Sequence, residues 1–168
     1  MTTWLRIMLR KGSNEVVTCA LANTGFEGLG PDILMPVNVA QRLGLGLSGG
    51  NVEVYAVRTA SGIAPIYRLK ENIDVKVLVN DRDTPIIGLT PVVSESVDYV
   101  ILSDKALTEL RVVIIDAGNG IWCFRDELGR VSRARVRQVR LWQYAVVDGP
   151  LYLLCMWLPR HRGIGLRS

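Results

Sequence analysis

Asn23, Thr24 and Gly25 form a short motif whose residue types and order could belong to a catalytic loop. The motif directly follows an apolar segment, residues 15–21, that is typical of a buried strand. A carboxylate delivered by such a strand could act as a general base, whereas the carboxamide of Asn23 does not titrate. Taken alone, the three residues are equally typical of a β-turn, because Asn and Gly tolerate unusual backbone angles.

Two aspartates are further candidates for acid–base chemistry. Asp32 is close to Asn23 in sequence and could be a substitute base, but it follows Pro31 in an expected loop. We therefore expect Asp32 to be solvated. Asp104 lies in the first turn of an expected helix, where the helix dipole favours a negative charge, and this structural role suffices for it.

Cysteine and histidine usage excludes several classes of site. No usual metal-ligand spacing joins the residues Cys19, Cys123, Cys155 and His161. We expect no metal and no organic cofactor. Three scattered cysteines are also too few for a disulfide framework, and residues 1–10 do not resemble a secretory signal, which together predict a cytoplasmic protein. The longest apolar run, residues 151–158, is too short to span a bilayer.

Short strands separated by glycine-containing turns surround the Asn23 motif. The pattern predicts strands at residues 4–10, 15–21, 51–59, 63–70, 73–79, 85–93, 98–102, 111–115 and 121–124. Helices are predicted at residues 36–43, with Gly44 just past the end, and at 104–110, with Ser103 as the N-cap. This order favours a mostly β barrel or sandwich over alternating βαβ units.

Several of these elements together resemble the retropepsin-like aspartic proteases, particularly their small microbial relatives. Residues 19–28 and the helical segment that ends at residues 42–45 resemble the active-site region of that family. A glycine-tipped hairpin resembles its flap, and residues 100–110 resemble its second apolar strand, turn and short helix. The similarity covers about residues 4–127 and implies a closed acid-protease β-barrel with two short helices. It also implies a flap that covers substrate through Ser61, Gly62 and Ile63.

The resemblance assigns specific roles to the motif. Asn23 occupies the position of the catalytic aspartate, Thr24 braces the two loops through its hydroxyl, and Gly25 permits the tight turn. Two aspartates of such a protease lie about 3 Å apart and share one proton. Because this chain contains one motif, the resemblance implies a homodimer that contributes Asn23 twice. Two carboxamides cannot activate water, although they can hydrogen-bond across a two-fold axis.

Three origins of Asn23 stay open, and with them the question of enzymatic activity. The residue is an engineered inactivation, a natural residue of a non-catalytic relative, or a precursor that deamidates to aspartate. A second departure from the family, Ser103 in place of a glycine, favours the natural origin. The chain is therefore predicted to have the fold of an aspartic endopeptidase and to be inactive as written.

The net charge of +4 is unevenly distributed along the chain. Residues 1–130 carry a net charge of −2, and residues 131–168 carry +6. We predict a retropepsin-like domain over residues 1–130 and an arginine-rich, apolar extension over residues 131–168. The arginines of the first part of this extension alternate with apolar residues; they are Arg133, Arg135, Arg137 and Arg140. Such a stripe is more typical of a solvent-facing element than of a nucleic-acid surface.

Peptide binding is the leading functional prediction. We expect a homodimer that binds a peptide or protein segment in extended form in a groove covered by the flap. The alternatives are a non-catalytic protein-interaction module built on the same dimer, and nucleic-acid binding through the arginines of the extension.

Overall fold

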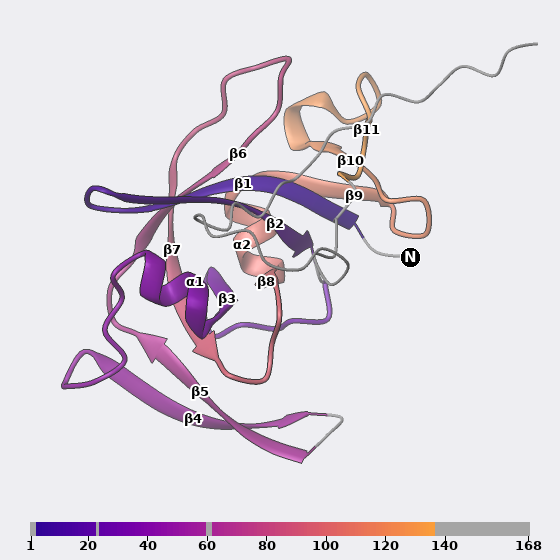
Figure 1. Ribbon diagram of the computed structural model, residues 1–168. Helices are drawn as coiled ribbons and strands as arrows, with labels where there is room; N and C mark the ends of the chain where they lie inside the picture. Colours follow the sequence, from indigo (N-terminus) through magenta and orange to yellow (C-terminus); the bar gives the residue numbers. More distant parts are fainter. Residues whose placement is uncertain (1–2, 23, 60–61, 137–168) are drawn as a thin grey trace, which may run out of the picture.

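The computed structural model describes residues 3–22, 24–59 and 62–136 (Figure 1). These residues form a mostly β structure with two short α-helices and one short 3-10 helix. The strands are β1 (Thr3–Lys11), β2 (Asn14–Ala22), β3 (Asp32–Pro36), β4 (Val52–Thr59), β5 (Gly62–Leu69), β6 (Ile73–Val77), β7 (Ile87–Ser94), β8 (Val100–Leu102), β9 (Val112–Asp116), β10 (Ile121–Phe124) and β11 (Arg133–Ala134). The helices are α1 (Val37–Arg42), α2 (Asp104–Glu109) and the 3-10 helix η1 (Arg125–Glu127).

Six strands close into a barrel. Their order is β3-β8-β2-β1-β6-β7, and β3 then pairs with β7, which completes the ring. The pairs β2–β8 and β3–β7 are parallel, and the other pairs of the ring are antiparallel. The hairpin of β4 and β5 continues the sheet beyond β7 and projects from the barrel at the bottom of Figure 1. The expected mostly β, closed-barrel fold with two short helices is confirmed.

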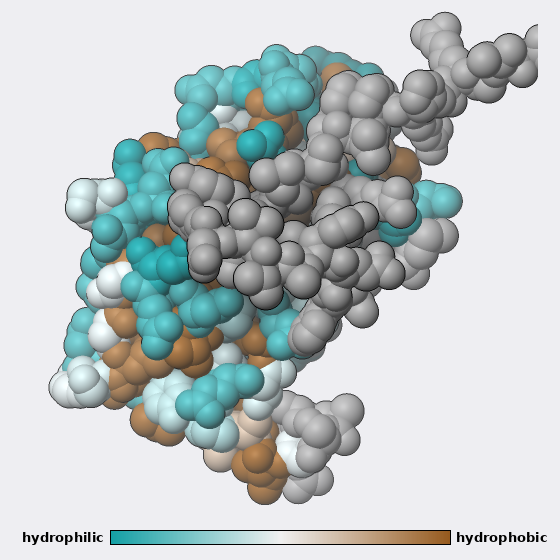
Figure 2. Space-filling view, viewed as in Figure 1, coloured by the Kyte–Doolittle hydropathy of each residue, from teal (hydrophilic) through white to brown (hydrophobic). Residues whose placement is uncertain are grey.

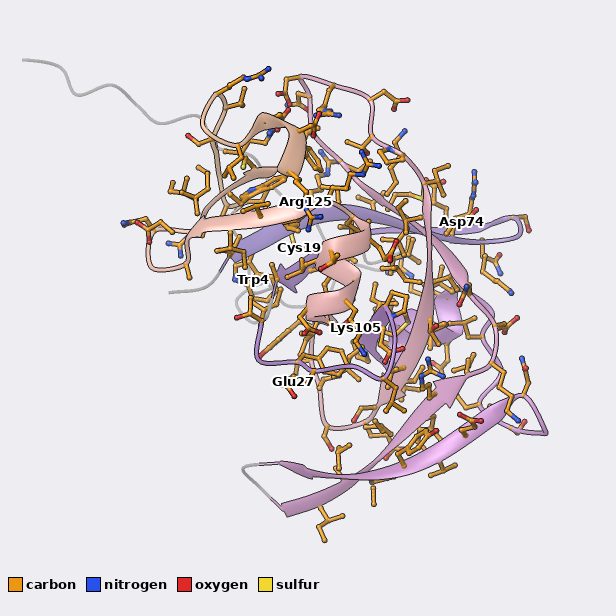
Figure 3. The ribbon with its side chains drawn as sticks, turned by 180° about the vertical axis from the view of Figure 1, so that it is seen from behind. Trp4, Cys19, Glu27, Asp74, Lys105 and Arg125 are labelled. Carbon is orange, nitrogen blue, oxygen red and sulfur yellow. The ribbon has the colours of Figure 1, made fainter. Side chains whose placement is uncertain are left out.

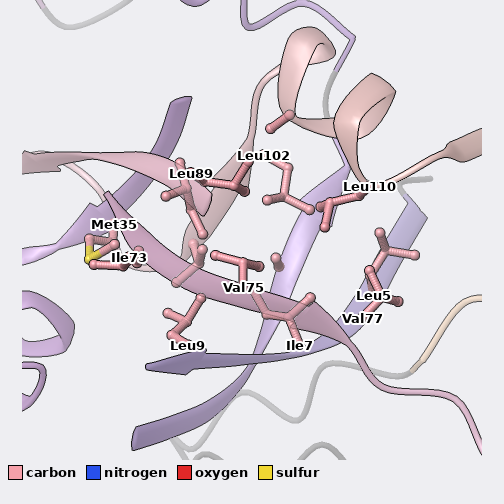
Figure 4. Packing of buried hydrophobic residues seen from close by; sticks show 14 of the residues in the cluster. Leu5, Ile7, Leu9, Met35, Ile73, Val75, Val77, Leu89, Leu102 and Leu110 are labelled. Atoms are coloured by element: carbon pink, nitrogen blue, oxygen red, sulfur yellow. The ribbon is translucent and has the colours of Figure 1, made fainter. Parts of the chain in front are cut away.

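The barrel interior is filled by side chains that alternate along the strands. On β1, Leu5, Ile7 and Leu9 are fully buried, and β6 contributes Val75 and Val77 (Figure 4). Because successive side chains of a strand point to opposite faces, every second residue enters the core. The alternation in the sequence therefore identifies these strands correctly.

Both α-helices lie within the segments that the sequence predicts, but α1 begins at Val37 and ends at Arg42, and α2 ends at Glu109. The side chain of Ser103 accepts a hydrogen bond from the backbone N–H of Ala106, which caps α2. Gly44 follows the end of α1 with a φ of +72°, a conformation that costs glycine little. The Ser103 cap and the position of Gly44 are confirmed, whereas Pro36, which was predicted within the first helix, is the last residue of β3.

A smaller sheet of β9, β10 and β11 packs beside the barrel (Figure 1). Beyond β11, the backbone N–H of Val136 donates to the carbonyl oxygen of Trp4, 3.1 Å away, which ties this segment to β1. The domain boundary at residue 130 stays a prediction, since most of the extension, residues 137–168, lies outside the described residues. No helix in the described ranges is long and apolar enough to cross a membrane.

The arginine stripe differs from the expectation at Arg133. Its side chain is only 11% exposed and donates to Asp81 Oδ2 at 2.5 Å and to Glu127 Oε1 at 2.7 Å. The guanidinium carbon also lies 5.1 Å from the centre of the Phe124 ring. Arg133 is thus held within the protein by carboxylates and an aromatic ring, so the solvent-facing interpretation is wrong for this residue. Arg137 and Arg140 lie outside the described residues.

Candidate functional site

The loop of residues 24–31 connects the end of β2 to β3 and carries the rest of the motif. Asn23 lies outside the described residues, whereas Thr24 and Gly25 are exposed in a turn. The loop is attached to α2 by two hydrogen bonds. The N–H of Asp104 donates to the Phe26 carbonyl oxygen at 3.2 Å, and Lys105 Nζ donates to that of Leu29 at 3.1 Å. Figure 3 shows Glu27 on this loop, below Lys105 on α2.

Asp32 ends this loop and is buried, with 2% of its surface exposed. Its Oδ1 accepts two hydrogen bonds from Arg68, from Nε at 3.2 Å and from Nη2 at 3.1 Å, and its Oδ2 accepts one from the N–H of Gly30 at 3.1 Å. The expectation of a solvated Asp32 is therefore wrong. A buried carboxylate requires a charged partner and hydrogen bonds, and Arg68 and Gly30 supply them. An aspartate engaged in this way is not poised to act as a base.

Ser103 joins the loop, β3 and α2. Its Oγ accepts from the N–H groups of Asp32 and Ala106, each at 3.1 Å, and donates to the carbonyl oxygen of Gly30 at 3.4 Å. A hydroxyl offers one donor and two acceptor sites, so the hydrogen-bonding capacity of Ser103 is fully used. The predicted cap is confirmed. The sequence shows no sign of the two contacts with residues 30 and 32, which lie some seventy positions away.

The hairpin of β4 and β5 stands where the resemblance places a flap. Its strands pair in register from Val52 opposite Leu69 to Thr59 opposite Gly62. Gly62 has a φ of +128°, which side-chain-bearing residues rarely adopt, and Ile63 is 74% exposed. Ser61 lies outside the described residues. The hairpin is therefore confirmed, while the substrate-binding roles of its tip residues stay predictions.

Both faces of the hairpin carry apolar side chains, and one of them also carries polar groups near the base. Val54 and Ile63 lie on one face and are exposed, and apolar atoms appear at the surface over this hairpin in Figure 2. The other face carries Glu53, Tyr55 and Arg68, of which Arg68 contacts Asp32. The hydroxyl of Tyr55 donates to Glu53 Oε2 at 2.9 Å, and this bond, with the charge of Glu53, raises the pKa of Tyr55. The face with the polar groups is the one that is directed at the loop after the motif.

These contacts define the chemistry that is open to the described part of the site. No group of three metal-ligating side chains occurs in the described ranges. Asp32 is the buried carboxylate that is closest in sequence to the motif. It forms an ion pair with Arg68. Sequence reasoning missed Arg68 and misjudged Asp32, because their contact joins positions 36 residues apart.

Comparison with known proteins shows a similarity of structure and no match to a family description or to a curated protein. Among solved structures, the chain is similar to the EIAV protease, a retroviral protease, in complex with the inhibitor HBY-793. That comparison has 14% sequence identity and a TM-score of 0.44, and it covers 66% of this chain and 88% of the protease. The similarity concerns the fold alone.

Proposed function

We propose that this chain is an aspartic-protease-like homodimer that binds an extended peptide between the β4–β5 hairpin and the loop of residues 24–31. The observation that carries the proposal is the contact of the hairpin with that loop. Arg68 on β5 reaches Asp32 at the end of the loop, so the flap-like element is attached next to the segment that carries Thr24 and Gly25.

An extended peptide is the ligand that suits a projecting hairpin. A β-strand offers backbone N–H and C=O groups that an extended chain can pair with, and alternate side chains then decide specificity. The hairpin carries the exposed apolar side chains of Val54 and Ile63 on one face, and its other face carries Glu53 and Tyr55 together with Val57, Ala64 and Ile66. We therefore propose a protein or peptide segment as the partner, with no metal or organic cofactor.

Catalysis is proposed to be absent because of Asn23. Peptide hydrolysis by this type of site requires one carboxylate to accept a proton from water and a second group to protonate the carbonyl of the substrate. A carboxamide does neither. In the proposed homodimer each chain contributes one Asn23, so the assembly would hold two amides where a protease holds two carboxylates.

The substitution Asn23→Asp tests this proposal directly. We expect the unsubstituted chain to leave a library of unstructured peptides intact between pH 4 and 7, and the variant to cleave them. A transition-state mimic of peptide hydrolysis is expected to inhibit that cleavage. Asn38→Asp is the matched control, because it makes the same chemical change at an exposed position of α1. Sedimentation of both proteins is expected to give the mass of a dimer.

Each outcome has a distinct meaning. Cleavage by the Asn23→Asp variant alone supports a protease fold that lacks its carboxylates. Cleavage by neither protein, with a dimer in both, contradicts the assignment of position 23 and favours the non-catalytic interaction module. A monomer at concentrations of about 100 µM contradicts the homodimer, since specific dimers of this kind form well below that concentration.

A further inference from the structure

The β4–β5 hairpin is attached to the barrel over a very short stretch. Its two strands pair with each other along their whole length, from Val52 to Leu69. Pairing with the barrel is confined to Tyr67 opposite Val93 and Arg68 opposite Val92. The part of the hairpin toward its tip, residues 55–59 and 62–66, is thus a projecting two-stranded ribbon. Such a ribbon has little stability of its own in water.

Arg68 sits at this attachment and holds it in two ways. Its backbone pairs with β7, and its guanidinium binds Asp32 through Nε and Nη2, at 3.2 and 3.1 Å. The side chain of Arg68 is 21% exposed and that of Asp32 is 3% exposed, so water screens the ion pair little. Two donors of a planar guanidinium also restrict the direction in which the side chain points.

Asp32 is a rigid point for this attachment because four separate groups hold it. Its N–H donates to Ser103 Oγ, its carbonyl oxygen accepts from the N–H of Ser103, and its Oδ2 accepts from the N–H of Gly30. Its backbone also lies in β3, opposite Thr90 of β7. A movement of Asp32 would therefore disturb β3, the loop and the start of α2 together.

We propose that Arg68 and Asp32 are positioning residues that set the angle and mobility of the β4–β5 hairpin over the loop of residues 24–31. Arg68 holds the base of the hairpin in place. Asp32, which directly follows the loop, connects that base to the loop through its ion pair with Arg68. The proposal rests on the proposed function only in treating the hairpin as the element that covers the peptide. The positions of the hairpin and of the loop of residues 24–31 are then coupled by this ion pair, in addition to the backbone pairing of β5 with β7.

Under this proposal, loss of the Arg68–Asp32 ion pair has a local effect that the loss of an ordinary stabilising contact would not have. If Arg68 fixes the hairpin base, its loss increases the opening of β4 and β5 and leaves the opposite side of the barrel unchanged. If the pair only contributes to overall stability, its loss speeds opening of the whole barrel together. Amide hydrogen exchange, read strand by strand, separates these two results.

The experiment compares the full-length protein with its Arg68→Gln variant, in the absence of any peptide. We expect amide exchange about fivefold faster or more at residues 52–58 and 62–67, with exchange on β1 and β2 within about twofold of the natural chain. Arg68→Lys keeps the charge and loses the fork, and is expected to restore part of the protection. Asp32→Asn is expected to resemble Arg68→Gln.

A matched control exists elsewhere in the barrel. Arg10 binds Asp74 through Nε at 3.2 Å and Nη2 at 2.8 Å, in the same two-donor arrangement between β1 and β6. Arg10→Gln is expected to leave exchange of the hairpin unchanged. Should Arg68→Gln fail to fold, the double variant Asp32→Asn with Arg68→Gln leaves no buried charge unpaired and is expected to show the same fast exchange of the hairpin.

Two results would overturn the proposal. One is unchanged exchange of the hairpin in Arg68→Gln and in the double variant. The other is acceleration that is equal on the hairpin and on β1 and β2. Because no peptide is present, these results do not depend on whether the Asn23→Asp variant cleaves peptides, so the proposal and the proposed function can fail separately.

Discussion

Ser103 and Asp32 are joined by a reciprocal pair of hydrogen bonds across 71 positions of the sequence. The N–H of Asp32 donates to Ser103 Oγ at 3.1 Å, and the N–H of Ser103 donates to the carbonyl oxygen of Asp32 at 3.1 Å. Ser103 is fully buried and caps α2 at the same time. The residue that departs from the glycine of the resembling family is therefore a structural junction in this protein.

Removal of the Ser103 hydroxyl should destabilise the protein substantially. Ser103→Ala leaves the N–H of Ala106 without its acceptor, and a buried unsatisfied donor costs about 1–3 kcal/mol. It also removes the longer of the two hydrogen bonds of the Asp32 N–H, which keeps its bond to the Gly30 carbonyl oxygen at 2.8 Å. We expect a loss of about 2 kcal/mol in the free energy of unfolding. Urea denaturation monitored by tryptophan fluorescence measures it. Thr108→Ala is the control, because that hydroxyl is exposed and bonds only within the helix; a loss of equal size there would contradict the role of Ser103.

Arg133 should contribute to stability more than a surface arginine does. Arg133→Gln removes the contacts with Asp81 and Glu127 and the stacking on Phe124. We expect the free energy of unfolding to fall by about 2 kcal/mol, in the range of partly buried charged hydrogen bonds. Arg130 is exposed three residues earlier, and Arg130→Gln is expected to change stability by less than about 0.5 kcal/mol. Similar effects of the two substitutions would show that Arg133 is ordinary surface.

Glu127 should make stability depend on pH in an acidic window. The hydrogen bond from Arg133 and a second one from Arg82 lower the pKa of Glu127 from its ordinary 4.5 to about 2. A carboxyl group with a depressed pKa stabilises the folded state fully above the unfolded value and loses that contribution as pH falls toward the folded one. The stability difference between the natural chain and Glu127→Gln is therefore expected to shrink between about pH 4.5 and pH 2.

Urea titrations at several pH values measure this difference. Glu15→Gln changes an exposed glutamate at the β1–β2 turn and serves as the control. Its stability difference from the natural chain is expected to be small across the same window. A Glu127→Gln difference that stays constant from pH 5 to pH 2 would show that Arg133 does not favour the ionised form.

Cys123 should resist modification in the folded protein. It is a free, fully buried cysteine on β10, and burial raises the pKa of its thiol. Because the thiolate is the reactive form, native Cys123 should alkylate with iodoacetamide about a hundredfold slower than in urea. Mass spectrometry of the peptide that contains Cys123 measures both rates. Comparable rates in the two conditions would place this thiol at the surface.

The sequence predicts most of the strands and both α-helices because their signals are local. Alternation identifies β1 and β6, and Ser103 and Gly44 mark the start of one helix and the end of the other. The short strand β3 was not predicted, since glycines and a proline precede it and its partners β7 and β8 are remote. β11 was not predicted either, since it has two residues and pairs with β10.

The candidate site is predictable only in part. The loop of residues 24–31 and the hairpin of β4 and β5 can be located from glycine positions and apolar runs. The environment of Asp32 cannot, because a carboxylate after a proline is usually solvated and its partner Arg68 is also unremarkable in sequence. Asp32, which was expected in solvent, is among the most buried polar groups of the described chain.

Local patterns of polarity, turn residues and helix caps thus determine the order of elements, the mostly β class and the position of the Asn23 motif. Only the tertiary structure decides that β3 closes the barrel against β7, that Ser103 holds Asp32, and that Arg68 and Arg133 are partly buried partners of carboxylates. The physical reason is that a side chain's burial and charge pairing depend on residues brought near by closure of the barrel. Those neighbours are far away along the chain and leave no local signal.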